Sequence, residues 1–88
     1  MNKLSKYIMA SKTREDVLLC LFRMKIARPS EIAFKIKKSR ATLTRIIDEL
    51  EKKKLVEPLE PKRATWKRYI LTESGERVAD DVKKLSRS

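Results

Sequence analysis

Hydrophobic and polar residues follow one another along this chain with the 3.6-residue period of amphipathic helices. The pattern is clearest after Ser39, where apolar residues fall at positions i, i+3, i+4 and i+7, namely Leu43, Ile46, Ile47 and Leu50. It predicts a helix over residues 39–53, with Ser39 as its N-cap and the apolar stripe buried. The opposite face is polar from Arg40 onward and is available to a partner.

Two shorter helices are predicted upstream. An apolar stripe over residues 17–24 indicates a helix from Thr13, its expected N-cap, to about residue 25. Pro29 is expected to stop this helix, because proline lacks the amide that a helix interior requires. Ser30 is expected to cap the next helix.

Short β-prone segments follow the long helix. A strand is expected to begin at Leu55, and Pro58 and Pro61 limit it because neither can donate to a ladder. A second β-prone segment covers residues 65–71. The two segments predict a small hairpin, or wing, at residues 57–68.

A final helix is expected to begin after Thr72, its predicted N-cap. Its apolar stripe consists of Val78, Val82 and Leu85. Together these elements predict an α+β, mostly helical fold: a winged helix-turn-helix with a three-helix core, a two-stranded wing and a C-terminal helix. Residues 1–12 are expected to form an N-terminal arm or helix, and residues 13–88 the winged helix-turn-helix domain.

The charge of the chain favours a polyanionic partner. Its 88 residues include 23 Lys and Arg against 12 Asp and Glu, a formal net charge of +11. Residues 37–68 hold eleven Lys or Arg and five acids, a net charge of +6, whereas residues 69–88 hold four of each. The alternative is a surface charged for solubility, but this distribution places the excess where a DNA reader needs phosphate contacts.

Several classes of function are disfavoured by what the sequence lacks. It contains no His and a single cysteine, Cys20, which lies in an apolar run and is expected to be a core residue. An enzyme is therefore not expected, and neither is a metal site or another cofactor. No apolar run approaches the roughly 20 residues that span a bilayer. We expect a cytoplasmic, nucleoid-associated protein without a membrane or small-molecule partner.

Candidate DNA contacts fall into two groups. The first surrounds the start of the 39–53 helix and consists of Lys38, Ser39, Arg40, Thr42, Thr44 and Arg45. Arginine can bind guanine through two hydrogen bonds, and threonine can contact a thymine methyl group. The second group lies in the wing and consists of Lys62, Arg63, Lys67 and Arg68, which could hold phosphates or enter a minor groove. Trp66 could lie on a sugar or base, or pack on the stem of the wing.

The segment over residues 28–78 resembles the winged helix-turn-helix of MarR-type transcription regulators, including small archaeal members. The strongest marks are LEKKKLVE at residues 50–57 and YILTESG at residues 69–75. The resemblance covers about two-thirds of the chain. It implies a recognition helix at 39–53, a wing at 57–68 and DNA contacts from both.

The chain departs from that family in two respects. Its wing contains two prolines and no glycine, and the chain is shorter than most MarR-type proteins, which dimerise through long terminal helices. We expect a homodimer. The candidate interface residues are Leu4, Tyr7, Ile8, Val78, Val82 and Leu85. The alternative for these side chains is packing in the core of one subunit.

The leading hypothesis is a sequence-specific, double-stranded DNA-binding transcription regulator. Its recognition helix would lie in the major groove and its wing on the backbone or minor groove. Two alternatives are a sequence-neutral chromatin protein and a winged-helix module that binds another protein.

Overall fold

The computed structural model describes residues 2–86. Met1, in the predicted segment 1–12, and residues 87–88, in the predicted domain 13–88, lie outside the described residues. The elements are α1 (Lys3–Met9), α2 (Lys12–Met24), β1 (Ile26–Ala27), α3 (Pro29–Ile36), α4 (Arg40–Lys52), β2 (Val56–Pro58), β3 (Tyr69–Leu71) and α5 (Glu73–Leu85). The predicted α+β, mostly helical class is confirmed.

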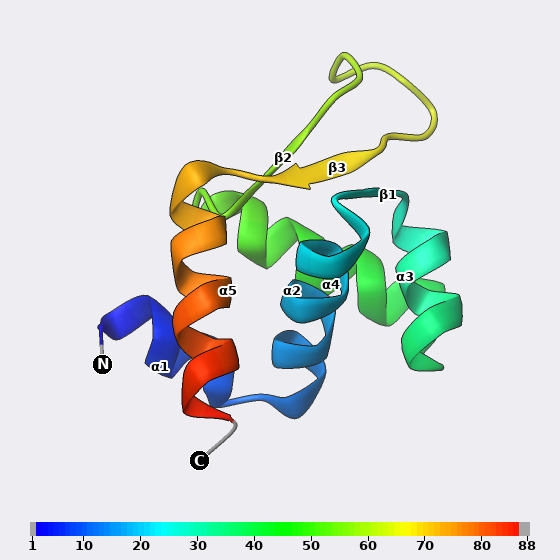
Figure 1. Cartoon of the computed structure of the whole chain (residues 1–88). Coiled ribbons are helices and arrows are strands. Elements are labelled where there is room, and N and C mark those ends of the chain that lie inside the picture. Colours follow the sequence, from blue (N-terminus) through cyan, green and yellow to red (C-terminus); the bar gives the residue numbers. More distant parts are fainter. Residues whose placement is uncertain (1, 87–88) are drawn as a thin grey trace.

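The helices pack around α2, which contacts α1, α3, α4 and α5. The three-stranded sheet lies across one end of the helices, and the loop between β2 and β3 extends beyond it as the wing (Figure 1). Helix α1 packs against both α2 and α5. Of the two predicted forms of the N-terminal segment, arm or helix, the structure has a helix.

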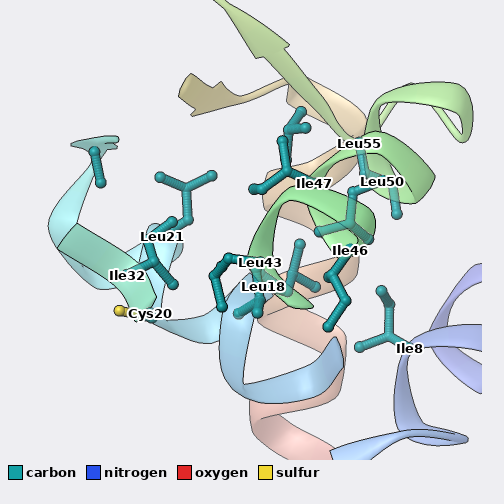
Figure 2. Packing of buried hydrophobic residues seen from close by; sticks show 14 of the residues in the cluster. Ile8, Leu18, Cys20, Leu21, Ile32, Leu43, Ile46, Ile47, Leu50 and Leu55 are labelled. Carbon is teal, nitrogen blue, oxygen red and sulfur yellow. The ribbon is translucent and has the colours of Figure 1, made fainter. Parts of the chain in front are cut away.

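One cluster of apolar side chains forms the core (Figure 2). The predicted stripe of α4 enters it, with Leu43 and Leu50 fully buried and Ile46 and Ile47 2% exposed. The predicted facing of the helix after Ser39 is therefore confirmed. Cys20 is buried in the same cluster, as expected for a core residue.

Two predicted helix caps are confirmed. The Ser39 hydroxyl accepts a hydrogen bond from the Thr42 amide at 3.1 Å, and it satisfies one of the unpaired amides at the start of α4. The Thr72 hydroxyl accepts from the Gly75 amide at 2.9 Å at the start of α5.

Two other predicted caps are wrong. Ser11 caps α2 in place of Thr13, since its hydroxyl accepts from the Arg14 amide at 3.2 Å. Pro29 begins α3 rather than ending the helix before it, and Ser30 is the second residue of α3. A proline fits a first helical position, where its missing amide has no helical partner in any case.

The sheet differs from the predicted two-stranded wing because β1 joins it. The strand order is β1-β3-β2, with both pairs antiparallel and Ile26 opposite Ile70. The strand β2 begins at Val56 rather than Leu55 and lies at an edge, which is where Pro58 can be accommodated. The strand predicted over residues 65–71 is confined to Tyr69–Leu71, and residues 65–68 belong to the wing loop.

The six predicted dimer residues separate into two sets. Ile8, Val78 and Val82 are buried in the core of this chain, as their alternative interpretation predicted, so in this conformation they offer no surface to a second subunit. The other three, Leu4, Tyr7 and Leu85, are half-buried, and two of them, Leu4 and Tyr7, pack against the core.

Candidate nucleic-acid interface

The turn between α3 and α4 presents cations to solvent. Lys37 ends α3 in the left-handed conformation, with φ 59° and ψ 49°, and the Lys38 amide donates to the Ala33 carbonyl at 3.0 Å. Both lysine side chains are exposed. Lys38 is a predicted DNA contact, and Lys37 precedes it in the same cationic turn.

The first turn of α4 has two kinds of polar side chain. Ser39 and Thr42 are engaged with each other, because the Ser39 hydroxyl donates to Thr42 Oγ1 at 2.9 Å while it caps the helix. Arg40 and Thr44 are exposed. The predicted DNA contacts at the start of α4 therefore divide into a capping pair and side chains that can reach outward. One of the outward side chains, Arg45, makes an ion pair with Glu49.

A cavity of about 380 Å³ lies between the wing and the start of α4. It is lined by residues from four segments: Arg28, Pro29, Ser30, Arg40, Thr44, Thr65, Trp66, Lys67 and Tyr69. It brings together three predicted contacts, Arg40, Thr44 and Lys67. None of the described residues that line it is acidic, and its cationic groups suit an anion such as a phosphodiester.

Arg28 is the cationic residue of this cavity that sequence reasoning missed. Its guanidinium lies over the Trp66 ring, 4.9 Å from the centroid, and so connects the start of α3 to the wing. Trp66 is 53% exposed, so a face or edge of the indole remains accessible. The contact of Trp66 with Arg28 leaves a stacking role on a sugar or base as a prediction.

An ion pair closes the base of the wing. Arg68 Nε lies 2.6 Å from Glu60 Oε2, and the Arg68 amide donates to Glu60 Oε1. The amide hydrogen bond lowers the pKa of Glu60 below its usual value, and the guanidinium lowers that pKa further. Arg68, a predicted DNA contact, is therefore engaged in holding the wing together.

The other cationic side chains of the wing differ in burial and in hydrogen bonding. Lys67 is half-buried and its ammonium donates to the Ala64 carbonyl at 3.2 Å. Lys62 and Arg63 lie in the exposed turn at the tip and make no ion pair with any residue of the range 2–86. The tip residues are therefore the wing side chains best placed to reach a phosphate.

Other kinds of site have little support in the described chain. Within residues 2–86, no helix has both the length and the apolar character needed to cross a bilayer. The same range holds no group of three or more His, Cys, Asp or Glu side chains that could bind a metal ion. Burial raises the pKa of the Cys20 thiol above its usual value.

Three solved structures resemble this fold closely. A mutant of MarR from E. coli matches with a TM-score of 0.80 and 22% identity, over 97% of this chain and 65% of that chain. A mutant of ZitR from Lactococcus lactis matches with 0.76 and 24%, over 88% and 53%. The S. aureus MepR–DNA complex matches with 0.76 and 19%, over 93% and 68%.

The chain thus spans about 53% to 68% of the length of these structures. The predicted resemblance to MarR-type winged helices is confirmed for the fold. None of the curated proteins compared with the chain matches it. A family model described as the HVO_A0261 N-terminal domain matches residues 3–88, nearly the whole chain. The chain belongs to the HVO_A0261 N-terminal domain family.

Proposed function

We propose that this chain is a sequence-specific, double-stranded DNA-binding transcription regulator and not an enzyme. Helix α4 would enter a major groove, and the wing would contact the flanking backbone or minor groove. Support at the level of fold comes from similar structures that carry the names of regulators, one of which, S. aureus MepR, was solved with DNA.

The observation that carries the proposal is the cavity shared by α4 and the wing. Arg28, Arg40 and Lys67 project around one concave surface, with an exposed aromatic ring at its rim. A DNA strand that passes from the recognition helix to the wing would place its phosphates along this surface. Phosphate contacts fix the register of a reader on the duplex, and side chains on α4 then select the bases.

Base selection is assigned to the exposed side chains of the first two turns of α4. Arg40, Thr44 and Arg45 are candidates for contact with base edges, because their side chains are exposed and lie outside the buried stripe of α4. Phosphate contacts are assigned to Lys38, Lys62, Arg63 and Lys67. Ser39 and Thr42 would act through the helix cap, whose amides favour an anion.

We further propose a homodimer with two recognition helices in successive major grooves, about 34 Å apart. Leu4, Tyr7 and Leu85 are the predicted interface residues that keep part of their surface exposed in one chain. A cytoplasmic, nucleoid-associated location follows from the same proposal. Sedimentation equilibrium with and without a palindromic duplex would test the dimer, and a monomer on DNA at all concentrations would contradict it.

Fluorescence anisotropy with a selected duplex and a shuffled duplex of equal composition tests the function. Arg40→Ala and Arg45→Ala should each weaken binding to the selected duplex by about 1–3 kcal/mol and change binding to the shuffled duplex much less. Equal affinity of the wild type for both duplexes would favour the sequence-neutral chromatin protein. No binding at low salt would favour the protein-interaction module.

A further inference from the structure

The carboxylate of Glu49, on α4, is shared between the interior and the surface. On one side, the Tyr7 hydroxyl donates to Glu49 Oε1 at 3.3 Å, and Arg14 Nη2 lies 3.6 Å from the same oxygen. On the other side, Arg45 Nη1 donates to Glu49 Oε2 at 3.2 Å. One acid therefore connects α1 and α2 with the outer face of the recognition helix.

The inner side of this cluster is fixed in place. The Arg14 guanidinium lies over the Tyr7 ring, 4.0 Å from its centroid, and Arg14 Nη1 donates to the Tyr7 carbonyl. The Arg14 side chain is only 19% exposed, and its buried Nε has no hydrogen-bond partner among the described residues. Within residues 2–86, Glu49 is the carboxylate at ion-pair distance from Arg14, so its departure would leave a covered cation unpaired.

The outer side of the cluster is exposed to solvent by comparison. The Arg45 side chain is 61% exposed, and Glu49 is its ion-pair partner within the described chain. An isolated exposed pair of this kind is weak and readily exchanged. Here, however, the acid is anchored from behind, and it therefore remains available to Arg45 whether or not DNA is near.

We propose that Glu49 is a positioning residue that sets the sequence discrimination of Arg45. Arg45 must leave the carboxylate to reach a phosphate, so contact with unrelated DNA brings little gain. A guanine edge offers two acceptors, and Nε and Nη2 of Arg45 can donate to them while Nη1 stays paired with Glu49. Glu49 thus weakens binding to unrelated DNA more than binding to a matched site. The inference rests on the proposed DNA-binding function.

The test compares Glu49→Gln with a matched control, Glu51→Gln. Each removes one negative charge from α4, but Glu51 is exposed and makes no ion pair with any residue of the range 2–86. Gln at position 49 retains an acceptor for Tyr7 and Arg14. Circular dichroism melting of both variants first establishes that they fold. Affinity is then measured for a selected and an unrelated duplex.

Glu49→Gln should tighten binding to the unrelated duplex by at least about threefold more than Glu51→Gln does. It removes the carboxylate that competes with phosphates for Arg45, and an exposed ion pair contributes a free energy of this order. The ratio of matched to unrelated affinity should fall by a similar factor. Equal effects of the two variants would overturn the inference and leave the proposed function intact. No binding of the wild type to either duplex would instead overturn the proposed function.

A double-mutant cycle separates positioning from a purely structural role. In an Arg45→Ala background, Glu49→Gln should change neither the affinity for the unrelated duplex nor the discrimination ratio beyond the effect of Glu51→Gln in that background. A persistent effect of Glu49→Gln there would mean that Glu49 acts by another route, and it would contradict the inference.

Discussion

The backbone of Gly75 lies against the carbonyl oxygen of Leu55, so closely that a Cβ at position 75 would overlap that oxygen. The same Leu55 carbonyl accepts a hydrogen bond from the Thr72 amide at 3.0 Å, and the Thr72 hydroxyl donates to the Lys54 carbonyl at 2.8 Å. The start of α5 is therefore docked on the turn that follows α4. This contact explains the position of the only glycine in the sequence.

Gly75→Ala should lower the free energy of unfolding by about 1–3 kcal/mol, because the new methyl group meets backbone rather than a side chain that can move aside. Urea denaturation followed by circular dichroism measures the change. Ser74→Ala, in the same turn of α5, is the control and should shift the midpoint little. A Gly75→Ala midpoint equal to that of the wild type would contradict this packing.

Leu50→Ala should destabilise the domain by about 2–5 kcal/mol, because Leu50 is fully buried on the stripe of α4. Leu59→Ala offers a comparison with the same chemical change at a side chain that is 42% exposed. That variant should lie within about 0.5 kcal/mol of the wild type. Similar melting temperatures for the two variants would mean that α4 faces the core differently.

Acid should loosen the base of the wing. The folded pKa of Glu60 lies below its usual value of 4.5, chiefly through the amide hydrogen bond from Arg68. A lowered folded pKa means that the stabilisation is present above pH 4.5 and is lost as the pH falls through the folded value. Trp66, the single tryptophan, reports on the wing by its fluorescence.

Trp66 emission should therefore change as the pH falls below about 4.5, and Glu60→Gln should remove the part of that change due to Glu60. Global acid unfolding is followed in parallel by circular dichroism at the same pH values. An identical emission titration in the wild type and Glu60→Gln would show that this carboxyl does not hold the wing.

Lys62→Ala and Arg63→Ala should each weaken binding to all duplexes alike and reduce the slope of log K against log salt by about 1. The reason is that each exposed tip cation would neutralise one phosphate. Lys84→Ala, which removes a cation paired with Asp80 on α5, is the control and should leave the slope unchanged. Slopes unaffected by the tip variants would remove the wing from the interface.

The features that the sequence predicted well are governed by neighbouring residues. The buried stripe of α4 follows from a repeat within one helix, and the caps at Ser39 and Thr72 follow from residues three positions away. Thr13 failed as a cap because Ser11, two positions earlier, is equally suited and adopts the extended conformation that a cap requires.

Other features depend on residues that are distant in the chain. The two-residue strand β1 exists because Ile26 pairs with Ile70, and no local pattern marks so short a strand. The place of Arg28 in the candidate interface arises from its contact with Trp66, which lies in the wing and is distant in the sequence. The surroundings of Glu49 likewise depend on α1 and α2, which bring Tyr7 and Arg14 beside it.

Selection of the pure protein on a random double-stranded library, sequenced at two salt concentrations, tests the central claim most directly. We predict recovery of a palindromic motif with half-sites about 10 base pairs apart, retained at the higher salt. Tight binding that yields no motif and disappears as salt rises would contradict sequence-specific recognition and identify the chain as a sequence-neutral DNA-binding protein.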